Sequence, residues 1–279
     1  MSVLESVFYG LLQGIAEFLP ISSSGHLALA QNLFGANGAE GNEYLAFNVL
    51  LHIATLVAVC TVYRKDVFLL FKGFFSLCKK LFTGKLNFKK LEYGEKLFVM
   101  LVIATLPLIP AILIKDLLEA VSSVSWAIGV LLIINGCVLF VSDKLSKGTA
   151  TIEKSPIKIA LYPGIAQVFG LLPGISRSGS TITGGLFGNF KREDAVKLSF
   201  LMSIPAILGA FVLEIPDMIS EGIATENILP FCIGALVAMI SGFGAIKLLQ
   251  FISRKNGFSY FSIYCVVIGI AAIIADMII

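Results

Sequence analysis

Six long apolar stretches recur along the chain, and their length constrains the fold more than any other feature. They cover residues 45–63, 97–114, 124–142, 196–215, 229–249 and 259–279. About 20 residues of α-helix cross a hydrocarbon core roughly 30 Å thick, and a helix satisfies all its backbone hydrogen bonds internally, as lipid requires. The sequence therefore predicts an all-α polytopic membrane protein with six transmembrane helices.

Composition supports this prediction. Hydrophobic residues make up 57% of the chain and charged residues 14%, whereas soluble domains average about 25% charged residues. A soluble core could not absorb so much apolar surface. The net charge of +3 gives no reason to expect a nucleic-acid partner.

Two further segments, about 3–34 and 157–190, are apolar but are interrupted near their middles by related phrases. The first phrase, LPISSSG, begins at Leu19, and the second, LPGISRSG, begins at Leu172. Proline removes a helical hydrogen bond and glycine loosens the turn. Each segment is therefore predicted to form two short helices that meet at a bend.

The two phrases belong to a longer repeat. A shift of about 150 residues superposes the order broken segment, span, span, span on itself. If the broken segments enter and leave on one face, three crossings per half turn the second half upside down relative to the first. The prediction is a single membrane domain over 1–279, built as an inverted-topology repeat of about 1–145 and about 155–279 with two broken re-entrant helical segments.

The charged connections indicate an orientation, because cytoplasmic loops carry an excess of lysine and arginine. Basic residues concentrate at 64–96, 144–158, 191–197 and 254–255, whereas acidic residues concentrate at 40–43, 116–119 and 214–226. We therefore expect the basic connections to lie inside. The acidic connections and both termini should lie outside.

The phrases also carry the polar residues that an apolar span would exclude. Gln13 and Glu17 lie four residues apart and so share one helix face. An ionised carboxylate costs about 2.5–3.5 kcal/mol within a membrane helix, so Glu17 should be paired, protonated or facing water. Arg177 is its expected partner, because an inverted repeat brings the two broken segments together near the midplane, where helix N-termini favour an anion.

The second phrase has the composition of a phosphate-binding loop. A guanidinium group binds phosphate oxygens in a bidentate manner, Gly179 allows close backbone approach, and Thr181 adds a hydroxyl group. The first copy has Ser23 where the second has Arg177, so one copy supplies acid, base and hydroxyl groups and the other supplies positive charge. This division suits phosphoryl transfer, which depends on positioning and charge neutralisation.

Some of these residues also suit a purely structural role. Single serines in membrane helices equally suit close packing and interhelical hydrogen bonds. His52 lies beside Asn48 in an apolar span. The sequence favours a structural role for His52 and leaves a supporting role at a pocket open.

At these residues the chain resembles a known family. QGIAEFLPISSSGH and PGISRSGSTI are similar to the two signature segments of the bacterial undecaprenyl-diphosphatase family, also called the undecaprenyl pyrophosphate phosphatase or bacitracin-resistance protein family, and the similarity extends over essentially the whole chain. The resemblance implies hydrolysis of a C55 isoprenyl diphosphate carrier to its monophosphate, which recycles the carrier for cell-wall synthesis and confers bacitracin resistance. It also implies a multi-pass protein of the bacterial cytoplasmic membrane with an active site open to the external side, and dependence on Mg²⁺ or Ca²⁺.

The resemblance also assigns residues by position. The catalytic residues that it implies are Glu17, Ser23, His26 and Arg177. The substrate phosphate-binding residues that it implies are Ser22, Ser24, Ser176, Ser178, Gly179 and Thr181. The implied cation ligands are Glu17 and Gln13. The chain departs from the family pattern at Gln13, where many members have glutamate, and at Asn48, where many have an acidic residue; the Gln13 carbonyl oxygen can complete a cation's shell but cannot act as a base.

Two alternatives are left open at this point. The nucleophile is either Ser23 or a water molecule activated by Glu17 or His26. A lipid-phosphate transporter or flippase is the alternative function, since inverted repeats with broken helices are typical of secondary transporters. The combination of hydroxyl, imidazole, carboxylate and guanidinium groups favours an enzyme. The expected partners are the isoprenyl diphosphate lipid and the bilayer, and the sequence leaves a homodimer open.

Overall fold

The computed structural model describes residues 1–33, 41–144, 148–221, 225–254 and 257–278. Within these ranges the chain is helical apart from its connections and one isolated β-bridge between Ala150 and Phe190. The helices are α1 (Val3–Phe18), α2 (Ser23–Leu33), α3 (Gly41–Val62), α4 (Arg64–Phe82), α5 (Tyr93–Thr105), η1 (Leu106–Leu108), η2 (Pro110–Ile114), α6 (Lys115–Ser122), α7 (Ser125–Lys144), η3 (Ile157–Ala160), α8 (Leu161–Phe169), α9 (Arg177–Phe187), α10 (Arg192–Glu221), η4 (Thr225–Asn227), α11 (Ile228–Ser253) and α12 (Phe258–Ile278). This confirms the all-α class.

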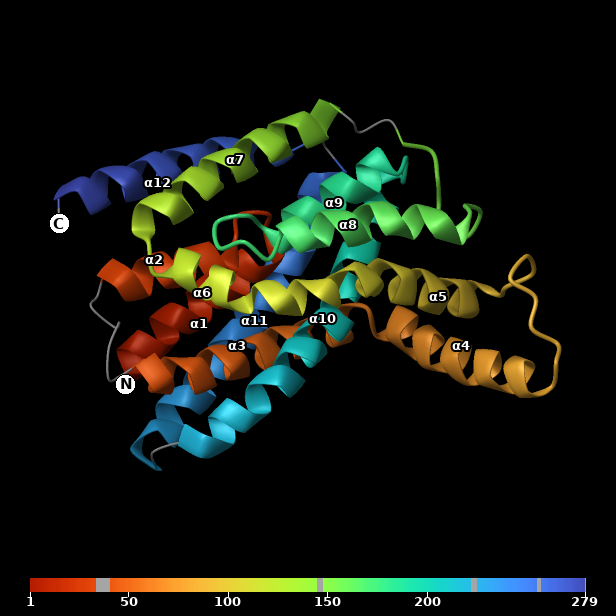
Figure 1. Cartoon of the computed structure of the whole chain (residues 1–279), viewed down its shortest axis with the longest axis horizontal. Helices are drawn as coiled ribbons and strands as arrows, with labels where there is room; N and C mark the ends of the chain where they lie inside the picture. Colours follow the sequence, from red (N-terminus) through yellow and green to blue (C-terminus); the bar gives the residue numbers. More distant parts are fainter. Residues whose placement is uncertain (34–40, 145–147, 222–224, 255–256, 279) are drawn as a thin grey trace.

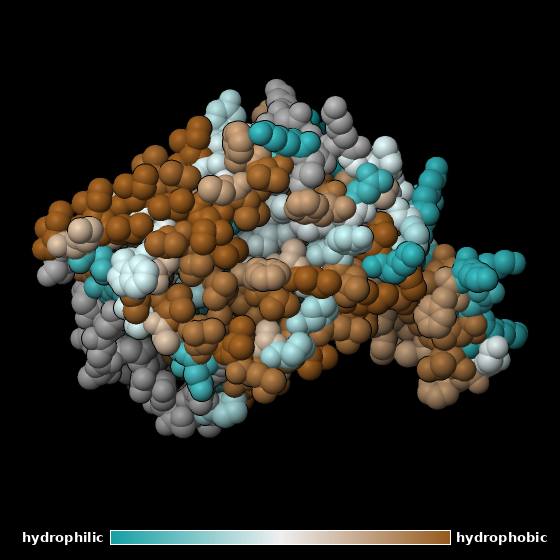
Figure 2. Space-filling model, turned by 45° about the horizontal axis from the view of Figure 1, so that its top comes forward, coloured by the Kyte–Doolittle hydropathy of each residue, from teal (hydrophilic) through white to brown (hydrophobic). Residues whose placement is uncertain are grey.

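Five helices among the described residues are long and apolar enough to cross a membrane. They are Tyr44–Val62 in α3, Ser125–Lys144 in α7, Arg192–Pro216 in α10, Ile228–Ser253 in α11 and Phe258–Ile278 in α12. These match five of the six predicted runs. Figure 2 shows apolar side chains over much of one face of the molecule, as a bilayer-embedded protein requires.

The sixth predicted run, 97–114, is not one continuous α-helix. α5 ends at Thr105, and the chain continues through the 3₁₀-helices η1 and η2. Pro107 and Pro110 lie in these turns, and proline cannot donate the hydrogen bond that would continue an α-helix. The run is helical, but the structure supports five long spans in the described chain rather than six.

The two interrupted segments each form a hairpin of two short helices, which confirms the predicted bends. α2 packs against α1, and α9 packs against α8. A Cβ atom at Gly184 of α9 would lie only 2.6 Å from the Cβ atom of Ala166 in α8, so glycine permits this close packing. In Figure 1 the two hairpins open toward opposite ends of the molecule, and their bends lie near each other in the interior.

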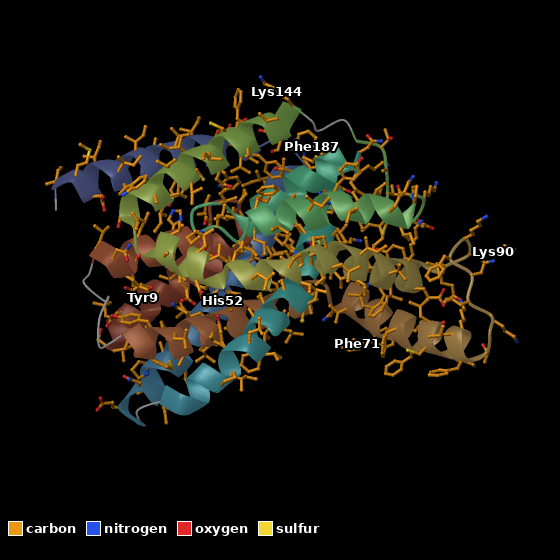
Figure 3. The ribbon with its side chains drawn as sticks, in the orientation of Figure 1. Tyr9, His52, Phe71, Lys90, Lys144 and Phe187 are labelled. Carbon is orange, nitrogen blue, oxygen red and sulfur yellow. The ribbon has the colours of Figure 1, made fainter. Side chains whose placement is uncertain are left out.

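The ends of the bundle differ in charge. Both termini lie at one end and the α4–α5 hairpin extends from the other (Figure 1). Lys90 lies at the tip of that hairpin, and Lys144 lies at the end of α7 farthest from the C-terminus (Figure 3). At the opposite end, the Met1 ammonium group donates to Asn227 Oδ1 at 3.1 Å, beside Glu226. The acidic and basic connections therefore separate as the charge pattern predicts; Glu40, Lys147 and Lys255 lie outside the described residues.

Glycines that precede the two repeated phrases fix how the hairpins pack. A Cβ atom at Gly14 of α1 would lie 2.5 Å from the carbonyl oxygen of Ala238 in α11. At Gly164 of α8, it would lie 2.7 Å from the carbonyl oxygen of Ala104 in α5. Small residues let membrane helices approach closely, so these two positions hold the hairpins against their neighbouring helices.

Candidate active site

The bends of the two hairpins contact each other directly. The Gly174 backbone N–H donates to Ser22 Oγ at 3.1 Å, and Ser178 Oγ donates to the carbonyl oxygen of Leu19 at 3.3 Å. Ser22 has φ of 73° and Gly174 has φ of 105°, a left-handed region that a non-glycine residue adopts at some cost. The contacts between the bends hold Ser22 in this conformation.

Asn135 of α7 joins the two bends from one side. Its Nδ2 donates to the carbonyl oxygen of Pro20 at 3.0 Å, and its Oδ1 accepts from the backbone N–H of Ser176 at 3.1 Å. Asn135 is fully buried. No motif in the sequence points to Asn135, but an amide inside an apolar span is a signal that could have found it, because buried amides need partners.

Glu17, at the end of α1, lies where the bends of the two hairpins meet. Its carboxylate forms an ion pair with the Arg177 guanidinium group, which begins α9. The carboxylate also accepts hydrogen bonds from Ser23 Oγ at 2.7 Å and from Gln13 Nε2 at 3.0 Å. The Glu17 side chain is only 4% exposed. A charge buried to this extent needs such partners, so the predicted pairing is confirmed.

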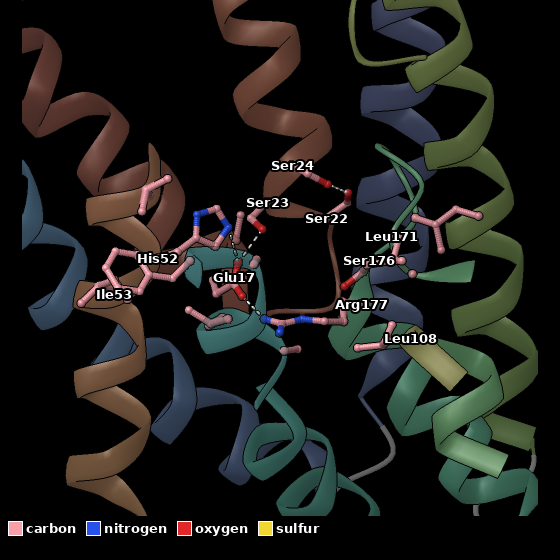
Figure 4. A pocket seen from close by; sticks show the side chains of 18 of the residues that line it. Glu17, Ser22, Ser23, Ser24, His52, Ile53, Leu108, Leu171, Ser176 and Arg177 are labelled. Carbon is pink, nitrogen blue, oxygen red and sulfur yellow. Dashed lines mark hydrogen bonds and ion pairs between the residues drawn. The ribbon is translucent and has the colours of Figure 1, made fainter. Parts of the chain in front are cut away.

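A cavity of about 230 Å³ lies beside this ion pair and is called the main cavity below. Its polar lining consists of Glu17, Ser22, Ser23, Ser24, His52, Ser176, Arg177 and Glu214. Figure 4 shows Ser23, His52 and Arg177 arranged around the Glu17 carboxylate. The cavity therefore combines one guanidinium group, hydroxyl groups and an imidazole ring, which suits a phosphate-bearing head group.

A second cavity of about 360 Å³, the polar cavity, shares lining with the main cavity at Ser24, Val49, His52 and Glu214. It extends past α2 and α3 to Ser122, the last residue of α6, and to Ser123, which follows it. The connection between α6 and α7 lies toward the end of the bundle that carries the termini (Figure 1). The polar cavity therefore gives the main cavity a hydrophilic path toward that end.

A third cavity of about 870 Å³, the apolar cavity, shares Val49, Ile53 and Phe211 with the main cavity. It lies along α3, α10 and α11, and its lining is predominantly aliphatic and aromatic. It extends to Arg64 at the start of α4. A molecule with a polar head and a long apolar chain would match the main and apolar cavities together.

His26, a predicted catalytic residue, does not line the main cavity. Its Nδ1 atom lies 2.8 Å from the Ser22 carbonyl oxygen and its Nε2 atom lies 3.0 Å from the Tyr264 hydroxyl oxygen. The His26 and Tyr264 rings stack with centroids 5.6 Å apart. Both ring nitrogens are therefore engaged in holding the first bend against α12.

Three of the predicted phosphate-binding residues, Ser178, Gly179 and Thr181, do not line the main cavity. The Gly179 N–H donates to Ser176 Oγ at 3.1 Å, which caps α9, and Ser178 Oγ lies 3.0 Å from the same oxygen. Thr181 Oγ1 donates to the Arg177 carbonyl oxygen at 2.9 Å. These contacts order the N-terminus of α9. Ser22, Ser24 and Ser176, by contrast, line the main cavity as predicted.

The cation that the resemblance implies requires oxygen ligands. Among the described residues no cluster of three or more His, Cys, Asp and Glu side chains is suited to a metal ion. Glu17 presents one carboxylate, and Gln13 Oε1 is buried without a hydrogen-bond partner in the described part of the chain. Mg²⁺ commonly binds one or two carboxylates together with waters and substrate phosphates. The donor set fits a cation held in this way by Glu17 rather than one enclosed by protein ligands alone.

Comparisons with known proteins show which family the chain resembles. A sequence model of the family described as bacitracin resistance protein BacA matches residues 6–271. A protein named undecaprenyl-diphosphatase from Alkaliphilus metalliredigens is 37% identical over 99% of this chain and 100% of its own length. Proteins of the same name from Methanosphaera stadtmanae and Halothermothrix orenii are 39% and 36% identical, over 100% and 98% of this chain and 99% and 98% of their own lengths.

Proposed function

Because the chain belongs to the bacitracin resistance protein BacA family, we propose that it hydrolyses undecaprenyl diphosphate to undecaprenyl phosphate and inorganic phosphate. The observation that carries this function is the convergence of Glu17, Arg177 and Ser23 on one cavity inside an apolar molecule. Phosphoryl transfer depends mainly on such positioning and charge stabilisation. The product is the lipid carrier that cell-wall synthesis reuses.

The two parts of the substrate occupy two different cavities. Its diphosphate occupies the main cavity, where the Arg177 guanidinium group binds phosphate oxygens and the serine hydroxyl groups donate to them. Its isoprenyl chain lies in the apolar cavity along α3 and α10, which shares Val49, Ile53 and Phe211 with the main cavity. The isoprenyl chain thus stays in the apolar part of the bilayer while the head group reaches the polar residues.

The reaction breaks the phosphoanhydride bond next to the terminal phosphorus atom. A nucleophile attacks that phosphorus atom, and the bond's electron pair leaves with the lipid monophosphate. Arg177 stabilises the charge that develops on the phosphoryl oxygens. A divalent cation bound through Glu17 would neutralise further phosphate charge. The Ser23 hydroxyl group, which donates to Glu17 Oε2 at 2.7 Å, either attacks or positions a water molecule.

Rapid-quench labelling distinguishes these two nucleophiles. Substrate labelled in its terminal phosphate is mixed with enzyme and stopped with acid within one turnover. Attack by Ser23 transfers the label to protein, and the Ser23→Ala variant does not become labelled. Attack by water gives labelled inorganic phosphate and no labelled protein at any time.

We also infer that the fold is an inverted-topology repeat of about 1–145 and about 155–279. Helices at equivalent positions make equivalent contacts: α1 packs on α11 as α8 packs on α5, and α7 packs on α12. At the α7–α12 contact, Gly129 and Gly269 face each other's carbonyl oxygens, with Cβ positions 2.7 and 2.5 Å away. Such reciprocal packing supports a two-fold relation between the halves.

The proposed site opens to the external side of the cytoplasmic membrane. The polar cavity leads toward the end that carries the termini and acidic connections, and the basic α4–α5 hairpin lies at the other end. Lysine-rich connections favour the cytoplasm. The head group would therefore enter from outside, and a homodimer stays a prediction from the sequence.

Phosphate release from purified protein in detergent tests the proposed function. A hydrolase releases phosphate from undecaprenyl diphosphate without a membrane to cross. A transporter or flippase built on the same repeat would bind the lipid but release none. Repeating the assay with a chelator, and then with Mg²⁺ or Ca²⁺ restored, tests the cation requirement separately.

A further inference from the structure

The outer face of α4 carries a row of phenylalanines, which is called the aromatic stripe below. Its members are spaced by three, four and seven residues and therefore share one helix face: Phe68, Phe71, Phe75 and Phe82. These residues are 63% to 88% exposed. Figure 3 shows Phe71 on the side of α4 that faces away from α5. A contiguous apolar patch of this kind indicates a partner or a membrane surface.

The opposite face of α4 packs on α5. A Cβ atom at Gly94 of α5 would lie 2.5 Å from the carbonyl oxygen of Leu69 in α4. Gly73 is buried on the same face, and Lys80 forms an ion pair with the buried Glu95 of α5. These contacts fix the rotation of α4 about its axis, so the aromatic stripe points away from α5.

A row of lysines runs beside the aromatic stripe. Lys65, Lys72 and Lys79 recur every seven residues, about two helical turns apart. Lys72 and Lys79 each lie four residues after a phenylalanine of the stripe, which makes them its neighbours on the helix surface. All three lysines are exposed and form no ion pair with another residue in the described part of the chain. The acidic residue of α4, Asp66, instead lies 3.5 Å from Lys197 Nζ of α10.

This combination excludes both a spanning helix and a helix surrounded by water. Lys72 lies near the middle of α4, where a spanning helix would expose it to hydrocarbon at a high cost. Accordingly, α4 is not among the described helices that are long and apolar enough to cross a membrane. In water the aromatic stripe would stay exposed. At the membrane surface, phenylalanines enter the acyl region and lysines reach the head groups.

We propose that α4 lies along the membrane surface at the basic end of the bundle and binds anionic phospholipids there. Phosphate groups of the lipids contact the ammonium groups of Lys65, Lys72 and Lys79, and the aromatic stripe enters the acyl chains beneath them. Lysines beside a membrane attract anionic lipids in this way. This lipid site is separate from the main cavity, which none of these residues lines.

The chain contains one tryptophan, Trp126, which allows a fluorescent reporter to be placed in α4. Phe71→Trp combined with Trp126→Phe puts the reporter in the aromatic stripe through exchanges between aromatic side chains. The full-length protein is reconstituted into vesicles of phosphatidylcholine and phosphatidylglycerol in which one lipid carries brominated acyl chains, which quench tryptophan on contact. The unmodified protein, whose Trp126 is exposed near the start of α7, is the matched reporter away from α4.

We expect phosphatidylglycerol to compete for the surroundings of the α4 reporter about five-fold or more better than phosphatidylcholine. Each lysine near an anionic membrane surface contributes about 1 kcal/mol, which is about five-fold in affinity. Replacing all three lysines of the row by glutamine should bring this preference close to one. High salt should weaken the preference, because salt screens charges at the surface.

A matched control removes three positive charges from other exposed positions at the same end of the bundle, namely Lys144, Lys154 and Lys158. This control variant should keep the preference at α4, and the Trp126 reporter should not respond to loss of the lysine row. Thermal unfolding in detergent confirms that each variant is folded.

Equal quenching of the α4 reporter by the two brominated lipids overturns the proposal, as does a preference that survives loss of the lysine row. Weak quenching by both lipids would show that water or a second copy of the chain covers the aromatic stripe, which also overturns it. Quenching requires neither substrate nor turnover, so none of these outcomes bears on the proposed hydrolase function.

Discussion

At the level of single residues, Arg177 supplies the cationic side chain that the main cavity offers to phosphate oxygens. We expect Arg177→Ala to lower kcat/KM by about 100- to 1,000-fold, the effect of removing one preorganised charge-stabilising donor. Arg177→Lys keeps the charge but loses the planar bidentate geometry. Its activity should therefore fall between that of the unmodified protein and that of Arg177→Ala. Phosphate release from purified protein provides the measurement, and full activity of Arg177→Ala would reject the site.

Loss of activity in Arg177→Ala needs a stability control, because the substitution leaves the Glu17 carboxylate buried without its partner. Removing one member of a buried ion pair typically costs about 3–5 kcal/mol. Adding Glu17→Gln removes the unpaired charge and should recover much of the thermal stability. It should not recover activity. This pattern separates the electrostatic cost of folding from the chemistry at the cavity.

The Glu17–Arg177 pair was accessible from the sequence because the cost of a buried charge demands a partner, and Arg177 occupied the equivalent bend. The surroundings of the two histidines were not accessible in the same way. His26 lies one helical turn after Ser22, whose φ is 73°, and its ring stacks on Tyr264 instead of lining the main cavity. Which way a bend points a side chain depends on tertiary contacts such as that between Gly174 and Ser22.

At the level of elements, helix packing depends on where glycine is required. A Cβ atom at Gly14 would overlap Ser241 Oγ and lie 2.5 Å from the Ala238 carbonyl oxygen, whereas nothing lies within 4 Å of a Cβ atom at Gly209 in α10. We expect Gly14→Ala to destabilise the protein by about 1–3 kcal/mol through overpacking. Gly209→Ala should be neutral or slightly stabilising, because alanine favours a helix. Thermal unfolding of both variants in one detergent tests the difference, and equal midpoints would contradict the α1–α11 contact.

The α4–α5 hairpin depends on an ion pair outside the long spans. Glu95 is buried, and its carboxylate lies 2.5 Å from Lys80 Nζ and 2.6 Å from Ser76 Oγ. Burial acts to raise the pKa of Glu95, but hydrogen bonds from Lys80 and Ser76 outweigh it and hold the pKa below its ordinary value of 4.5. The pair's contribution is therefore fully present above pH 4.5 and is lost as the pH falls through the folded-state pKa.

We accordingly expect Glu95→Gln to lower the unfolding temperature at neutral pH, and this difference from the unmodified protein to shrink as the pH falls below 4.5. Glu92→Gln is the matched control, because Glu92 lies 3.6 Å from the same lysine but is 73% exposed, and exposed pairs contribute little. Thermal unfolding across a pH series measures both variants. A constant difference for Glu95→Gln at every pH would show that packing, and not charge, explains its effect.

A helix could be predicted from the sequence wherever the length of an apolar stretch is enough to define it, as in α3, α7, α11 and α12. The run at 97–114 shows the limit of that criterion. Its composition is that of a span, but Pro107 and Pro110 divide it into an α-helix and 3₁₀ turns. Leu108 from one of these turns lines the main cavity. The prolines were visible in the sequence, but their consequence for the site depended on which elements pack beside them.

At the level of the whole molecule, the distribution of charge between the two ends predicts sidedness. In a variant whose five native cysteines are replaced, single cysteines at Ser123 and Lys85 report opposite ends, since both positions are exposed. Ser123 lines the polar cavity and should react with a membrane-impermeant maleimide in intact cells. Lys85, in the basic hairpin connection, should react only after permeabilisation. Phosphate release by both variants serves as the folding control. If the cysteine at Lys85 reacted in intact cells and the one at Ser123 only after permeabilisation, the polar cavity would lie on the cytoplasmic side, and external entry of the head group would be rejected. The site itself would be unchanged, because the route of entry and the chemistry at Glu17 and Arg177 rest on separate observations.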